Sequence, residues 1–179
     1  MLKIEQARIN EHFADIVKIA RQHYFTEQDG RTNGFYHYFP GGEHLVRMIE
    51  NNPLCGVVLD DDELIAFLTA ADDQRIADVA KWGDDDILRQ ILEFKPLIYA
   101  EQIALKYPKT RKGASSLGMI ASRLNSQAEE RGLPIYALVV ESPWRNVDSE
   151  RFVKNQGYER VGEIDSWEEG RLGIYRKNK

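Results

Sequence analysis

The chain has 179 residues, of which 42% are hydrophobic and 30% are charged, and its formal net charge is −5. This length fits one folded domain with a sizeable core, and the composition excludes a disordered chain. The acidic balance argues against a nucleic-acid-binding protein, because that binding depends on clustered Lys and Arg. It is compatible with a cationic substrate, and equally with a charge that only keeps the protein soluble.

The one cysteine, Cys55, excludes an internal disulfide and a cysteine-based metal site. We expect it to be a buried small hydrophobic residue rather than a nucleophile. Residues 1–13 lack the apolar segment of a signal peptide, and the apolar run at residues 64–71 is too short to cross a bilayer. These features predict a cytoplasmic protein without a membrane partner.

The first half of the chain predicts three strands and three helical segments. Strands are expected at residues 2–8, 55–61 and 64–73, the last two joined by a tight polar turn at Asp61 and Asp62. Helices are expected at residues 10–24 with Asn10 as the N-cap, at residues 43–52, and at residues 73–96 in two pieces separated at Gly83. The negative charges of Asp84, Asp85 and Asp86 would be stabilised by the positive dipole end at the start of the second helical piece.

The second half predicts a strand, a helix and a strand, then a short helix and two more strands. The expected ranges are 97–107, about 115–131 with Gly132 as C-cap, 135–141, 146–157 with Asn146 as N-cap, 158–165 and 171–177. The strand–helix–strand order requires a parallel pair with a right-handed crossover, and the flanking hairpins make the sheet mixed. We therefore expect one α/β domain over residues 1–179, with a helical insertion at about 72–95.

The stretch YPKTRKGASSLGM, residues 107–119, combines basic residues with a run of small ones. Free N–H groups and the positive dipole end make a helix N-terminus an anion site, and small side chains let a phosphate approach the backbone. Arg111 and Lys112 would add charge at the rim. The stretch matches neither a Walker loop nor a dinucleotide-binding glycine motif, so a pyrophosphate cradle and a solvated surface turn both remain open.

Glu101 lies in the middle of the strand expected at residues 97–107, in a run that is otherwise apolar. Burying a carboxylate is costly unless the group is paired or used. A carboxylate that acts through a water molecule can take the proton from an ammonium group. Two interpretations follow: a general base, or a structural glutamate paired with a Lys or Arg.

The segment from residue 97 to residue 164 resembles the GCN5-related N-acetyltransferase (GNAT) family. In that family a central strand ends near a proline and is followed by a Q/R-x-x-G-x-G/A loop, and here Pro108 precedes Arg111 at the expected distance. A second family pattern, N-x-x-[AS]-x-x-[FL]-Y-x-x-x-G-[FY], is matched by Asn146, Ser149, Phe152, Gly157 and Tyr158. Residues 1–96 are similar only in the order of their elements.

The resemblance implies a GNAT-like acyl-CoA acyltransferase fold, with a central twisted mixed sheet and helices on both faces. It implies acetyl-CoA as co-substrate, lying where the central strand and its neighbour splay apart, and direct attack by a primary amine. Glu101 resembles the strand glutamate that some members use as the base. The residues implied in cofactor binding are Ile103, Ala104, Leu105, Lys106, Lys109, Thr110, Arg111, Lys112, Gly113, Ala114, Ser115, Ser116 and Asn146, with Ser142 as another candidate near the pantetheine arm.

The chain departs from the family pattern in two places. Counted from Arg111, the two glycine positions hold Ala114 and Ser116, whereas a register from Thr110 recovers Gly113 and loses the Arg or Gln. The tyrosine that often protonates the leaving thiolate corresponds to Val153, which cannot do so. These departures keep open a non-catalytic acyl-CoA-binding or sensing domain. The acidic surface and the loop aromatics also keep open a partner-binding domain on the same fold.

The acceptor is expected to be an amine of a small molecule or a peptide, whose identity the sequence leaves open. The aromatic segment at residues 34–39 either lines the acceptor side of the cleft or covers the edge of the core. The four histidines, His12, His23, His37 and His44, show no metal-ligand spacing, and no metal is expected. Nucleic acid is not an expected partner, whereas an exposed aromatic loop or an edge strand could support a homodimer.

Overall fold

The structure is a computed structural model that describes residues 1–23, 41–83, 85–143, 145–166 and 170–178. The aromatic segment 34–39 and Asp84 therefore lie outside the described residues, and so does His37. In the described part of the chain, no helix has both the length and the apolar character needed to span a membrane.

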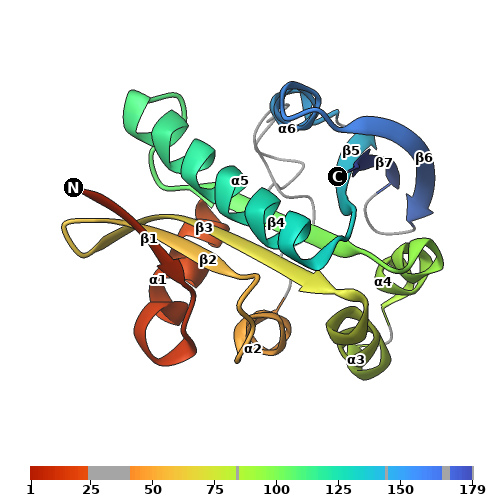
Figure 1. Ribbon diagram of the computed structural model, residues 1–179, viewed down its shortest axis with the longest axis horizontal. Helices are drawn as coiled ribbons and strands as arrows, with labels where there is room; N and C mark the ends of the chain where they lie inside the picture. Colours follow the sequence, from red (N-terminus) through yellow and green to blue (C-terminus); the bar gives the residue numbers. More distant parts are fainter. Residues whose placement is uncertain (24–40, 84, 144, 167–169, 179) are drawn as a thin grey trace.

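Seven strands form one sheet with the order β1-β2-β3-β4-β5-β7-β6 (Figure 1). Their bounds are β1 Leu2–Gln6, β2 Gly56–Asp60, β3 Glu63–Asp72, β4 Ile98–Leu105, β5 Ile135–Ser142, β6 Glu159–Ser166 and β7 Gly170–Lys177. Only β4 and β5 are parallel among these neighbours, and the other pairs are antiparallel. The mixed sheet with one central parallel pair that the sequence predicts is confirmed.

Helices cover both faces of the sheet. Their bounds are α1 Ile9–Gln22, α2 Gly42–Ile49, α3 Asp73–Gly83, α4 Asp86–Ile91 followed by a 3-10 turn at Leu92–Phe94, α5 Arg111–Arg131 and α6 Val147–Asn155. Figure 1 shows α5 lying across one face, with α1, α2 and α3 on the opposite side. Ile120 and Leu124 of α5 pack with Ile98 of β4, whereas Ile16 of α1 packs with Phe67 on the other face.

Two predicted helix starts are corrected. The N-cap of α1 is Arg8 rather than Asn10, and the carbonyl of Arg8 accepts from the backbone N–H of His12 at 2.9 Å. Helix α5 begins at Arg111, four residues before the predicted start at about Ser115, because the hydroxyl of Thr110 caps it. The small residues that looked like a turn are therefore the first two turns of a helix.

The parallel pair β4–β5 is short, and this shapes the centre of the molecule. Its register has three pairs, Ile98 with Ile135, Tyr99 with Tyr136, and Ala100 with Ala137. Beyond these pairs β4 stays with β3 and β5 stays with β7, so the two strands separate into a fork. On the β3 side, Thr69 is opposite Gln102 and Ala70 is opposite Ala100, which leaves Glu101 as the extra residue of a β-bulge at the base of the fork.

Candidate functional site

Glu101 is held from two other elements of the fold. Nε2 of His44, on α2, lies 2.5 Å from Oε1 of Glu101, and the hydroxyl of Thr69, on β3, donates to Oε2 at 2.9 Å. The side chains of His44 and Glu101 are each 10% exposed. The partner of this buried carboxylate is thus a histidine, not the Lys or Arg considered from the sequence.

The electrostatics of His44 follow from this contact. Burial lowers the pKa of the imidazole, but the negative charge of Glu101, its hydrogen bond and the more distant charge of Asp85 together outweigh burial. The net result is a pKa of His44 above its ordinary value of about 6.5. The pair therefore binds a proton more readily than a solvated histidine would.

Sequence reasoning missed the role of His44. A local signal was present, because His44 lies on the same buried face of α2 as Leu45, Met48 and Ile49. A polar side chain on the apolar face of a helix needs a hydrogen-bond partner. Its partner lies 57 residues away in the sequence, so only the packing of α2 against the sheet identifies it.

The free edge of β4 narrows the set of backbone groups that can meet a cofactor. The N–H of Lys106 donates to the carbonyl of Ile65 at 2.8 Å, so this residue faces β3. Backbone groups alternate sides along an antiparallel strand, which turns those of Ala104 toward β3 as well and those of Ile103 and Leu105 toward the fork. The backbone groups of Ile103 and Leu105 are thus turned toward the fork, as expected for groups that pair with a cofactor. The N–H of Lys106 and the backbone groups of Ala104 are turned toward β3 instead.

The small-residue stretch is shaped by the backbone just before it. The hydroxyl of Thr110 accepts from the N–H of Gly113 at 3.0 Å, and the carbonyl of Thr110 accepts from the N–H of Ala114 at 3.0 Å. A Cβ on Gly113 would lie 2.3 Å from the carbonyl oxygen of Tyr107, so no side chain fits there. Ser116 is buried and its hydroxyl donates to the carbonyl of Lys112 at 2.9 Å. Ala114 and Ser115 are exposed on the first turns.

The cations around this helix start differ in their surroundings. Lys112 is paired with the carboxylate of Asp60, which also lies 3.2 Å from the amino terminus. Lys106 is paired with Glu63 on the same hairpin. In the part of the chain that the structure describes, Arg111 has no ion-pair partner, and it is exposed. Lys109 is also exposed and has a φ of 63°.

Asn146 has a structural task. It is 5% exposed and its side chain accepts from the N–H of Ser149 at 3.1 Å, which makes it the N-cap of α6 as the sequence predicts. Its own N–H donates to the carbonyl of Val140 at 2.9 Å. Val153 is 6% exposed and packs in the core beneath α5, so the position where the resemblance places a tyrosine is apolar.

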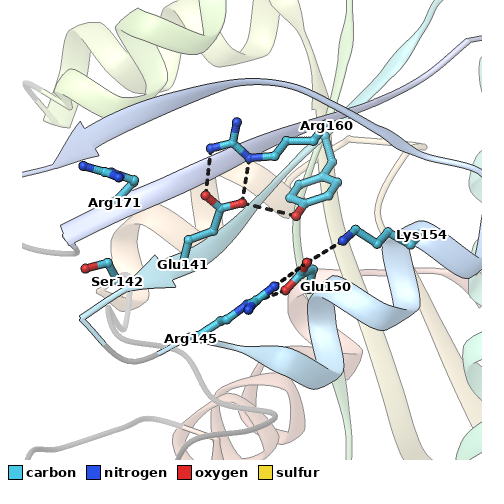
Figure 2. Close-up of a pocket in the computed structure, with 8 residues that line it drawn as sticks. Glu141, Ser142, Arg145, Glu150, Lys154, Arg160 and Arg171 are labelled. Atoms are coloured by element: carbon cyan, nitrogen blue, oxygen red, sulfur yellow. Dashed lines mark hydrogen bonds and ion pairs between the residues drawn. The ribbon is translucent and has the colours of Figure 1, made fainter.

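A polar cavity of about 420 Å³ lies between α6 and the ends of β5, β6 and β7 (Figure 2). Its lining residues are Glu141, Ser142, Arg145, Glu150, Lys154, Arg160, Arg171 and Tyr175. Arg160 donates to Glu141 at 2.9 and 2.8 Å, and Arg145 donates to Glu150 at 2.7 and 2.9 Å. Both carboxylates are therefore neutralised within the cavity wall.

A group of side chains that could ligate a metal lies near the start of the chain. Ligand atoms of Glu5, Glu11 and His12 come within 4.8 Å of one another. Each already has a protein partner: Lys3 is 2.8 Å from Glu5, Arg8 is 2.8 Å from Glu11, and the N–H of Arg8 donates to His12 at 3.0 Å. These contacts describe a small network of ion pairs and hydrogen bonds.

No protein-family model and no curated protein sequence matches the chain. Solved structures do match it along its whole length. Arabidopsis thaliana Naa50, in complex with the bisubstrate analogue CoA-Ac-MVNAL, is 10% identical with a TM-score of 0.67, covering 99% of both chains. Drosophila melanogaster polyamine N-acetyltransferase is 14% identical with a TM-score of 0.67, covering 100% of both.

A GNAT-family acetyltransferase from Bacillus cereus is 18% identical with a TM-score of 0.61, covering 100% of this chain and 98% of the other. The identities are low, so these likenesses concern the arrangement of the elements. The chain has the fold of the GCN5-related N-acetyltransferases.

Proposed function

We propose that the protein is an acyl-CoA-dependent N-acyltransferase that moves an acetyl group from acetyl-CoA to a primary amine. One observation carries the proposal: the parallel pair β4–β5 stops at Ala100 and Ala137, and the next residue of β4 is the buried carboxylate of Glu101. A fork with an acid–base group at its base would offer both free strand edges for a thioester arm and a group that takes up a proton.

The cofactor would lie along the free edge of β4. The five steps from Glu101 to Lys106 span about 16 Å of strand, which is the scale of an extended pantetheine arm. Ile103 and Leu105 turn backbone groups toward the fork, where they could pair with the amides of that arm. At the far end, the first amides of α5 and the side chain of Arg111 would hold the pyrophosphate.

The reaction would proceed by direct attack. The acceptor ammonium loses a proton to Glu101, through a water molecule, and the neutral amine attacks the thioester carbonyl. A carbon–nitrogen bond forms, and the carbon–sulfur bond breaks once the oxyanion has been stabilised by backbone N–H groups at the fork. The nitrogen releases its second proton to solvent as the amide forms, and the leaving thiolate takes one proton from solvent, because Val153 is an apolar core residue.

The finer parts of the function belong to the same proposal. The acceptor is an amine of a small molecule or a peptide, in keeping with the polyamine and peptide substrates named for two of the similar structures. A cytoplasmic location fits Cys55, which is fully buried as a free thiol. A homodimer stays a proposal drawn from the sequence.

A second candidate, a domain that binds acyl-CoA without turning it over, is favoured by one observation. The residue at the usual position of the acid, Val153, is packed in the core. This candidate predicts cofactor binding without acetyl transfer to any amine.

Calorimetric titration with acetyl-CoA tests the proposal. Arg111→Ala should weaken binding about three- to tenfold, the scale of one exposed charge interaction. Arg89→Ala, which removes the same charge from α4, should leave the affinity unchanged and serves as the matched control. The absence of binding heat and of thermal stabilisation at saturating acetyl-CoA would overturn both candidates. Binding without transfer to a panel of amines would favour the second.

A further inference from the structure

The carboxylate at the fork and the imidazole of His44 form a close pair that the resemblance does not account for. A nitrogen and an oxygen 2.5 Å apart, each carrying a lone pair, would repel unless a hydrogen lay between them. The pair therefore holds at least one proton in the N–O contact. His44 comes from α2 and Glu101 from β4, so the contact also joins a helix to the base of the fork.

We propose that His44 is a positioning residue for Glu101, and that the His44–Glu101 pair, rather than the carboxylate alone, takes up the proton released by the acceptor amine. This inference rests on the proposed function. It adds a residue from α2 to the acid–base group and gives that group a specific pH behaviour.

The geometry fixes the carboxylate from both sides. Oε1 of Glu101 meets His44 and Oε2 accepts the hydroxyl of Thr69 at 2.9 Å, so both oxygens are hydrogen-bonded and the group cannot rotate freely. A base held in one orientation loses less entropy when it accepts a proton from a bound substrate.

The surroundings of the pair make the contact strong. Both side chains are 10% exposed, and the neighbouring residues Leu45, Met48 and Ile49 of α2 are fully buried. Electrostatic interactions gain strength where water is excluded. A buried charge without a partner is costly, so each member of the pair depends on the other.

The proton balance closes among the pair, the substrates and solvent, which takes the second proton of the nitrogen and supplies one to the thiolate. Before reaction, Glu101 is ionised and His44 is neutral with its proton on Nε2, which gives the pair a charge of −1. The proton leaves the acceptor ammonium and neutralises the pair, while the freed amine forms the carbon–nitrogen bond. After the product leaves, the pair returns the proton to solvent, and no further reagent is needed.

Asp85 at the start of α4 is the other charged group that acts on His44 among the described residues. Nearby on the same side of the fold are the thiol of Cys55 before β2 and the guanidinium of Arg47 on α2. Asp85 helps to raise the pKa of His44. Burial raises the pKa of the Cys55 thiol to about 12, so it stays neutral. The guanidinium of Arg47 lies 4.3 Å from the centre of the Trp82 ring.

The pH profile of kcat/KM tests the inference. The pair cannot accept a proton once it already carries one, so activity should fall as pH drops through the pKa of the pair, above about 6.5. In His44→Gln the amide still donates to Glu101 but does not titrate. We expect its kcat to fall about tenfold or more, the acid limb to move to lower pH, and the KM for acetyl-CoA to stay unchanged. Lower activity with an unmoved acid limb would mean a merely structural His44 and would overturn the inference.

A second measurement needs no turnover. The imidazole of His44, assigned in NMR spectra by its loss in His44→Gln, should titrate above pH 6.5 in the unmodified protein. In Glu101→Gln it should titrate below pH 6.5, because burial then outweighs the more distant charge of Asp85. An unchanged titration in Glu101→Gln would overturn the inference even if acetyl transfer occurs. Coupled titration without transfer to any amine would overturn the proposed function, and with it the catalytic role, while establishing the shared proton.

Discussion

Gly113 is the residue in the candidate phosphate cradle whose identity depends most on its surroundings. The carbonyl of Tyr107 lies 2.3 Å from where a Cβ would be, and this carbonyl also accepts the hydroxyl of Thr110 at 2.8 Å. The glycine thus allows the backbone before α5 to fold against the helix start. Its role in the turn would hold even in a protein that binds no phosphate.

We expect Gly113→Ala to destabilise the protein by about 1–3 kcal/mol, because the added Cβ meets backbone that cannot move independently. Chemical denaturation followed by circular dichroism measures this. Gly118→Ala is the matched control in the same helix, since its Cβ would meet nothing within 4 Å. That exchange should stabilise the protein by about 0.5–1 kcal/mol through helix propensity. Equal effects of the two exchanges would contradict the steric argument.

Residue-scale features differ in how well a single sequence predicts them. Gly132 as the C-cap of α5, Asn146 as the N-cap of α6 and Asp85 at the start of α4 were all expected, and the structure confirms them. Caps depend on residues within one turn of each other, so local sequence is enough. The partner of Glu101 could not be predicted this way, because His44 lies on a separate element.

At the scale of elements, α6 is attached to the rest of the protein by an ion network as well as by its core residues. Glu150 is buried and accepts from Arg145 before the helix and from Lys154 one turn later, at 2.6 Å. The same network lines the cavity at the end of β5 (Figure 2). The position of α6 against the sheet therefore responds to the charge on one carboxylate.

The hydrogen bonds from Arg145 and Lys154 lower the pKa of Glu150 to about 2. A lowered pKa means that the stabilisation is present above the unfolded-state pKa of about 4.3 and is lost as pH falls toward about 2. We expect the free energy of unfolding to fall between pH 4.5 and pH 2.5 in the unmodified protein, and less steeply in Glu150→Gln. Urea denaturation across this range is the measurement, with Glu159→Gln on β6 as the exposed control. Parallel curves for the two variants would contradict this role of Glu150.

The strand elements were predicted well, and the start of α5 was not. Alternating and continuous apolar runs locate strands within a few residues, as at β2, β3 and β5. The stretch before Ser115 looked like a turn because it is basic and rich in small residues. Thr110 caps the helix there, and this cap outweighs the low helix propensity of glycine and serine. Gly113 is needed in the first turn because a Cβ would collide with the carbonyl of Tyr107.

At the scale of the whole molecule, acidic residues surround the candidate phosphate cradle. The β2–β3 hairpin places Asp60 against Lys112 and Glu63 against Lys106. The hydrogen bond from Lys112 lowers the pKa of Asp60, so this carboxylate stays ionised at neutral pH. In a chain with a net charge of −5, these two carboxylates weaken the attraction of the cradle for an anionic ligand while Lys112 stays paired with Asp60.

Asp60→Asn should therefore strengthen the binding of acetyl-CoA about two- to fivefold, because Lys112 becomes free to meet a phosphate. Asp61→Asn removes the same charge from the neighbouring residue, which pairs with the amino terminus at 2.6 Å and not with Lys112, and should have a smaller effect. Calorimetry at low and high salt measures both, and the difference should shrink as salt screens the exposed charges. Equal gains for the two variants would attribute the effect to net charge alone.

The order of strands and helices and the central parallel pair follow from local patterns and from the geometry of strand connections. The fork, the bulge at Glu101, the backbone groups of β4 that face the fork and the partner of the buried carboxylate depended on tertiary structure. Strand register and side-chain pairing are set when distant segments pack together, and no pattern within one segment specifies them. The chemistry proposed for this chain lies in those contacts, between His44 on α2, Thr69 on β3 and Glu101 on β4.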